Sequence, residues 1–112
     1  IILLVVGVLS YSAFSAKTPD QPVRLMFKCV AGKILFDHKT HTDESGYSIS
    51  CSDCHHNLEE GEATKPEACG ECHEPESQDE DVPGRADAFH AQCIGCHEAE
   101  AGPKKCASCH VM

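Results

Sequence analysis

The sequence predicts a small domain with little regular secondary structure, whose interior is formed by bound groups more than by apolar side chains. Three observations lead to this prediction. The chain has 112 residues, and domains of this size usually need disulfides, metals or cofactors to fold stably. Large apolar residues are scarce, with no Trp, four Phe and two Tyr. Nine cysteines, by contrast, are available for cross-links or cofactor attachment.

The N-terminal segment is the most aliphatic part of the chain. Residues 1–9 are apolar residues and Gly, and small or polar residues follow them up to residue 16. This pattern is typical of a cleavable secretory signal, with Ala13-x-Ser15 as a cleavage site, of an uncleaved signal-anchor, or of a helix buried against a partner. We favour the second interpretation and expect an apolar membrane-anchor (transmembrane) helix over residues 1–16. No initiator Met precedes Ile1, so we expect further residues upstream.

A linker and a single domain follow this segment. Residues 17–22 contain two prolines and predict the linker, and residues 23–112 predict one domain. Short apolar runs at residues 23–27 and 33–36 predict a short β-hairpin at the start of the domain.

The rest of the domain is rich in loops and acidic residues. Residues 57–66 and 74–84 are acidic and contain Gly and Pro, which is typical of solvated loops. The clearest helix covers residues 86–98, and we expect only a few other short helices, which carry the cysteines. The formal net charge of −9 argues against nucleic acid as a partner, because nucleic-acid binding requires a basic surface. Basic protein partners fit this charge better.

Eight of the nine cysteines belong to four Cys-x-x-Cys-His motifs. This motif is typical of covalent c-type haem attachment. Cysteines three apart share one face of a helical turn and reach the two vinyl groups of one porphyrin, while the following histidine binds the iron. Zinc sites or disulfides between the cysteines would give no reason for a histidine after every second cysteine. The cysteines are Cys51, Cys54, Cys69, Cys72, Cys93, Cys96, Cys106 and Cys109, and the histidines after them are His55, His73, His97 and His110.

The remaining four histidines match the number of predicted haems. They are His38, His41, His56 and His90. The alternative axial ligand is methionine, but the chain offers only Met26, within an apolar run, and Met112, at its end. We therefore predict four covalently bound c-type haems, each with two histidine ligands. Neighbours on a helix point about 100° apart, so His56 is expected to serve a different haem from the residue before it.

The motifs resemble those of the class III cytochromes c, the small tetrahaem cytochromes of sulfate- and metal-respiring anaerobes. The resemblance covers residues 23–112 and rests on the apolar run into Phe36-Asp37-His38-Lys39-Thr40-His41, on Cys-x-x-Cys-His-His at residues 51–56, and on the order of the later motifs. It implies axial pairs of His38 with His55, His56 with His73, His41 with His97, and His90 with His110, for the first to fourth haems.

The sequence departs from the family pattern in three respects. All four motifs are short, whereas family members often have Cys-x₄-Cys-His at two sites. His90 lies unusually close to Cys93. The lysine patch that many members use to dock hydrogenase is absent from this acidic chain.

Two histidines on each iron leave no open position for a substrate, so we expect an electron-transfer protein and not an enzyme. We expect it to be tethered to the cytoplasmic membrane, with its haem domain on the periplasmic (outer) side. It would connect a quinone-linked membrane complex to a periplasmic or extracellular redox partner. Two alternatives are a subunit of a haem filament and a multihaem reductase, which would need a haem with an open position. Cys29, outside the motifs, is interpreted as a partly buried thiol in the hairpin, against a disulfide to a partner or an iron ligand.

Overall fold

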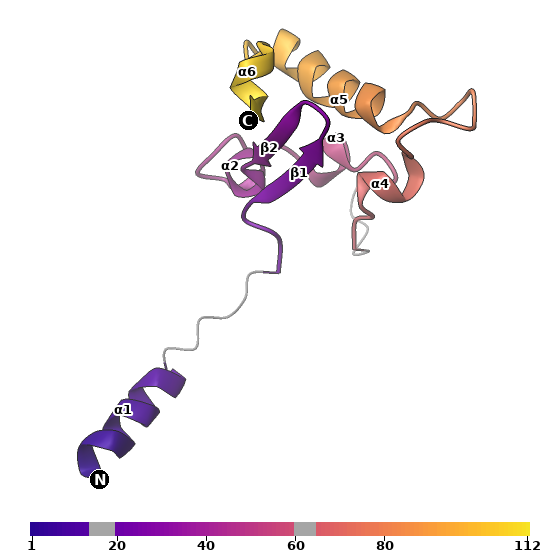
Figure 1. Cartoon of the computed structure of the whole chain (residues 1–112). Helices are drawn as coiled ribbons and strands as arrows, with labels where there is room; N and C mark the ends of the chain where they lie inside the picture. Colours follow the sequence, from indigo (N-terminus) through magenta and orange to yellow (C-terminus); the bar gives the residue numbers. More distant parts are fainter. Residues whose placement is uncertain (14–19, 60–64) are drawn as a thin grey trace.

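The computed structural model describes residues 1–13, 20–59 and 65–112 (Figure 1). It is a small domain with short helices and a small antiparallel sheet, preceded by a separate N-terminal helix. The elements in chain order are α1 (Ile2–Ala13), β1 (Leu25–Cys29), β2 (Gly32–Phe36), α2 (His38–Thr42), α3 (Cys51–Cys54), α4 (Cys69–Cys72), α5 (Arg85–Ala99), α6 (Cys106–Cys109) and β3 (His110–Val111).

The sheet contains the hairpin that the sequence predicts and one further strand. β1 and β2 pair antiparallel, and β3 pairs antiparallel with the other edge of β2, where Ile34 lies opposite His110. Gly32 lies at the turn with φ +107°, and a β-carbon at this position would lie 2.6 Å from the carbonyl oxygen of Val111. Only glycine therefore allows both the turn and the close approach of β3. β3 was not predicted, because two residues are too few to give a strand pattern.

The prediction of a membrane-anchor helix over residues 1–16 is wrong. Among the described residues, no helix is long and apolar enough to cross a membrane. α1 has 12 residues, or about 18 Å at 1.5 Å per residue. The hydrocarbon layer of a bilayer is about 30 Å thick. Residues 14–16 of the predicted anchor and residues 17–19 of the predicted linker lie outside the described residues.

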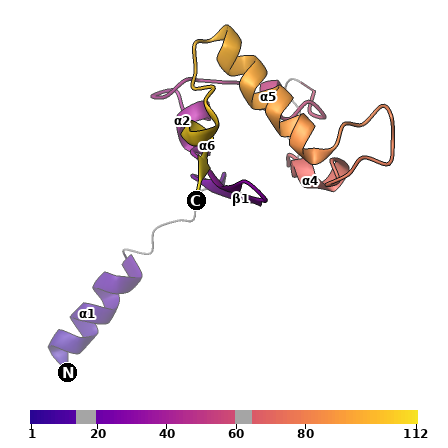
Figure 2. The same ribbon diagram turned by 45° about the horizontal axis from the view of Figure 1, so that its top comes forward.

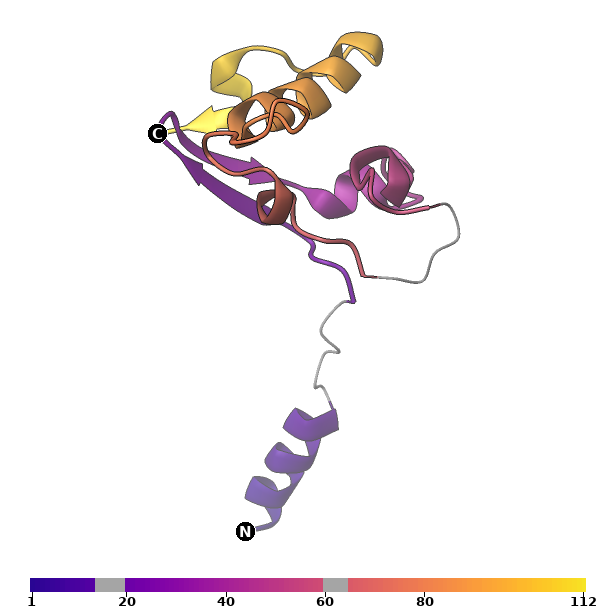
Figure 3. The same ribbon diagram turned by 90° about the vertical axis from the view of Figure 1, so that its right-hand side faces the viewer.

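Side-chain burial does not hold this fold together. None of the described residues is buried. The few apolar contacts are local: the ring of Phe27 lies 4.9 Å from that of Phe89 and 6.4 Å from that of Phe36, centroid to centroid. They connect the hairpin to α5, which lies with α6 on one side of it (Figures 1 and 3).

The helices are short and carry the predicted motifs. α5 matches the helix expected over residues 86–98 to within a residue at each end, and α3, α4 and α6 are single turns that begin and end at motif cysteines. α2 was not predicted as a separate helix. It begins after Asp37, whose side chain accepts a hydrogen bond from the backbone N–H of Thr40 at 3.0 Å. Figure 2 shows α5 beside α4, and α2 behind α6.

Candidate metal centre

Each motif places its two cysteines and its histidine on one helical turn. In α3 the backbone N–H of His55 donates to the carbonyl of Cys51 at 2.8 Å, and in α4 that of His73 donates to Cys69 at 2.9 Å. The same bond ends α6, where His110 donates to Cys106. The sulfur atoms of each motif thus lie one turn apart, and the histidine follows immediately. This is the local geometry that attachment to one porphyrin edge requires.

The cysteines of different motifs lie near one another. The side chains of Cys54 and Cys93 reach the surface, yet protein atoms crowd them and raise the pKa of both thiols. Neighbouring thiols raise the pKa further: Cys96 acts on Cys54, and Cys109 acts on Cys93. Cysteines of different motifs are therefore close enough to act on one another and are not spread along an extended chain.

Three spare histidines lie opposite motif histidines from other parts of the chain. The ring centroids are 6.5 Å apart for His41 and His97, 5.9 Å for His56 and His73, and 6.2 Å for His90 and His110. With a metal–imidazole bond of about 2.0 Å, two imidazoles on opposite sides of one iron have centroids about 6.2 Å apart. The residues present therefore fit a haem iron. These pairs have the members that the resemblance implies, and ligation itself stays a prediction.

The remaining implied pair, His38 with His55 of the first haem, is not brought together in this way. Among the described residues, His38 and His55 form no ring contact, and His38 instead lies edge-on to Phe36 with centroids 6.1 Å apart. The Nδ1 atom of His38 is enclosed, with no hydrogen-bond partner in the described part of the chain. The same part of the chain contains no group of three or more His, Cys, Asp or Glu side chains that could hold a bare metal ion.

Backbone carbonyls orient three of the candidate ligands. Nδ1 of His41, His73 and His97 lies 2.8 Å from a carbonyl oxygen in each case. An Nδ1–H that donates to a carbonyl leaves Nε2 unprotonated and available to a metal. The accepting residues are Asp37, Pro83 and Pro103.

His110 has a different neighbour. Its Nδ1 lies 3.5 Å from the sulfur of Cys29, which in turn lies 3.4 Å from the carbonyl oxygen of Gly32. The expectation that Cys29 is partly buried is wrong, because the residue is exposed at the end of β1. The pairing of β3 with β2 brings His110 alongside it.

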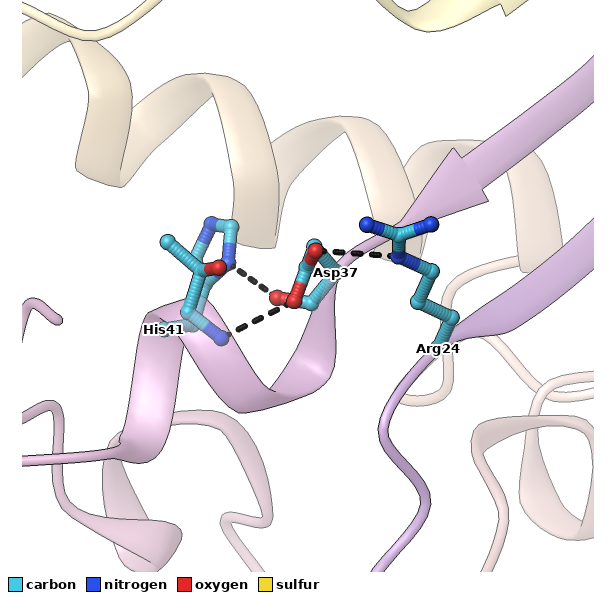
Figure 4. A network of polar contacts seen from close by, with 4 residues as sticks. Arg24, Asp37 and His41 are labelled. Carbon is cyan, nitrogen blue, oxygen red and sulfur yellow. Dashed lines mark hydrogen bonds and ion pairs between the residues drawn. The ribbon is translucent and has the colours of Figure 1, made fainter.

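A polar network fixes the start of α2, which carries two candidate ligands (Figure 4). Nε of Arg24 lies 3.1 Å from Oδ2 of Asp37, and Oδ1 of Asp37 accepts from the backbone of Thr40 at 3.0 Å. These hydrogen bonds, Thr40 first and then Arg24, lower the pKa of the Asp37 carboxyl. The backbone carbonyl oxygen of Asp37 also forms the hydrogen bond with Nδ1 of His41.

These supporting residues were not predicted from the sequence. Asp37 could have been found, because an aspartate directly before a helix is a common N-cap. Pro83 and Pro103 act through backbone carbonyls, which carry no sequence signal. Gly102 is another case: its backbone N–H donates to the carbonyl of His97 at 2.8 Å.

The comparisons with known proteins agree with this geometry. The class III cytochrome c family matches residues 13–110, most of the chain. The chain belongs to this family. Its members are multihaem c-type cytochromes and electron-transfer proteins, so the cofactor is haem c.

Three relatives illustrate the similarity. The chain is 38% identical over 69 residues to nine-heme cytochrome c of Desulfovibrio desulfuricans, a match that covers 55% of this chain and 20% of the relative. It is 38% identical over 95 residues to high-molecular-weight cytochrome c of Nitratidesulfovibrio vulgaris, covering 80% of this chain and 17% of the relative. It is 26% identical over 93 residues to cytochrome c3, 26 kDa, of Desulfomicrobium norvegicum, covering 72% and 79%. The chain thus spans about a fifth of the first two relatives.

Proposed function

We propose that residues 23–112 hold four covalently bound haems, each with two histidine ligands, and pass electrons between redox proteins on the outer, periplasmic side of the cytoplasmic membrane. The observation that carries the proposal is the placement of three spare histidines 5.9–6.5 Å from motif histidines of distant segments. A surface histidine with no ligand would have no reason to face another imidazole at this spacing.

The protein's part in this function is to hold the histidine ligands in place and to exclude other ligands from the irons. Bound haem supplies one-electron chemistry, and two imidazole ligands keep its potential low compared with Met/His ligation. Filling both axial positions leaves no site for substrate. Because three of the histidine pairs join different segments, their sites would lie close together within about ninety residues, which shortens the path for electrons.

The partners are proposed from charge. The formal net charge of −9 favours a basic surface on the donor or acceptor, and electrostatic steering would then speed their encounter. We propose redox proteins, among them subunits of a membrane complex, as partners. Association with such a basic partner weakens as salt is added, because the charges are exposed and screened.

The first site provides a test against an enzymatic function. Since His38 and His55 form no ring contact among the described residues, this is the site where an open iron position would first be found. Electron transfer through four six-coordinate haems predicts that carbon monoxide leaves the absorption spectrum of the ferrous protein unchanged. A carbon monoxide-dependent shift would identify a haem with an open position and favour the reductase.

The haem count tests the proposal directly. Purified chain is expected to carry four haems, measured by pyridine haemochrome and by intact mass. The double variant C106A/C109A removes one attachment site and should carry three, while C29S, outside the motifs, should retain four. Colourless protein, bound zinc, or fewer than four haems in the unaltered chain would contradict the proposal.

A further inference from the structure

Arg85, the first residue of α5, lies against the second motif. Its Nε donates to the carbonyl oxygen of His73 at 2.9 Å, and its Nη2 lies 3.4 Å from the carbonyl oxygen of Gly70. A β-carbon at Gly70 would lie 3.2 Å from Nη2, closer than an ordinary contact. The glycine inside the motif thus leaves the guanidinium room to lie over the turn.

The neighbouring backbone strengthens this contact. The N–H of Arg85 donates to the carbonyl of Glu74 at 2.7 Å, and Nδ1 of His73 lies 2.8 Å from the carbonyl oxygen of Pro83. The segment around Arg85 therefore holds His73 both by its ring and by its backbone. α4 lies beside the start of α5, as Figures 1 and 2 show.

The two carbonyls that Arg85 binds belong to Gly70, within the single-turn helix α4, and to His73, the residue directly after it. The last carbonyls of a helix have no partner within it and need donors from elsewhere. A guanidinium offers several N–H groups in a fixed planar fork, so one side chain can bind two carbonyls at once. A lysine keeps the charge but lacks the fork.

We propose that Arg85 is a positioning residue for His73 and the cation that raises the midpoint potential of the second haem. This inference rests on the proposed function and extends it to one site. A fixed positive charge near an iron disfavours the ferric form, which carries one more positive charge than the ferrous form. Acidic residues surround the motif in sequence, with Glu71 inside it and Glu74 directly after it, so Arg85 opposes their effect.

The test uses the complete haem-loaded chain. The four midpoint potentials and the haem-methyl NMR shifts are measured, and the second haem is assigned through the ring protons of His56 and His73. R85M should lower the potential of that haem alone, with a several-fold higher ferric-to-ferrous ratio at fixed potential. R85K should restore the potential and leave altered methyl shifts. The matched control R24M removes an arginine charge elsewhere, where Arg24 pairs with Asp37 just before α2. It should leave the potential of the second haem as it is in the unaltered protein.

The outcomes separate the two proposals. Fewer than four haems in the unaltered protein would overturn the proposed function. Four haems with the second potential unmoved in R85M, or moved equally by R24M, would overturn the role of Arg85 alone. If R85M does not assemble, R85K decides: unchanged methyl shifts in that variant would refute positioning by the fork.

Discussion

Replacing Gly102 by alanine should disturb the third haem site through a direct collision. An added β-carbon would lie 2.5 Å from Cδ2, 2.6 Å from Cγ and 2.9 Å from Cβ of His97. Carbon atoms normally approach to about 3.5–4.0 Å, so the ring must move by about 1 Å. The ring cannot move freely, because its Nδ1 lies 2.8 Å from the carbonyl oxygen of Pro103. The backbone of His97 is also held, because its carbonyl accepts a hydrogen bond from the N–H of Gly102 at 2.8 Å.

The size of this displacement determines the expected result. A shift of about 1 Å is half of a metal–imidazole bond of about 2.0 Å, so G102A should weaken or break the bond from His97. Overpacking of this kind costs about 1–3 kcal/mol of stability. We expect one haem of four to change from low to high spin, seen by electron paramagnetic resonance and absorption, together with a lower unfolding temperature.

G95A is the matched control for this experiment. A β-carbon at Gly95 would meet nothing within 4 Å, although the residue lies in the same helix and the same motif as His97. Alanine there should stabilise the helix by about 0.5–1 kcal/mol and leave the spin state of all four haems unchanged. If G102A gave the same spin state and unfolding temperature as G95A, the geometry of the third site would be refuted.

Three further results are expected. G32A places a β-carbon 2.6 Å from a carbonyl of β3 at a φ of +107°, so it should displace His110 and change the spin state of the fourth haem only. The pKa of Asp37 is lowered below its unfolded value, chiefly by the hydrogen bond from Thr40; its stabilisation is therefore complete above pH 3.8 and is lost as the pH falls through the folded pKa. D37N should flatten this acidic decline in a series of thermal melts. C29S should carry four haems by intact mass, and fewer would show that the thiol is required for assembly.

The sequence predicted the chemistry of the site better than its surroundings. Motif spacing indicated a helical turn at each attachment position, because cysteines three residues apart share one face of such a turn. The hairpin followed from two apolar runs around a glycine. The helix of residues 85–99 followed from its periodicity. These are local features, and local features are what a sequence pattern records.

What could not be predicted depends on contacts between distant segments. Nothing in the sequence around Pro103 indicates that its carbonyl oxygen would form a hydrogen bond with Nδ1 of His97. The second strand partner of β2 is a two-residue segment more than seventy residues away. The membrane-anchor prediction failed for another reason: the apolar composition of residues 1–9 was given more weight than the shortness of the run, and α1 has only 12 residues where a span needs about 20.

The lack of any buried side chain among the described residues has a cellular consequence. A polypeptide that gains so little from hydrophobic burial has few means of resisting proteases before its iron porphyrins are attached. Haem attachment and resistance to proteolysis would then be gained together, and we expect the amount of intact protein to follow the supply of haem.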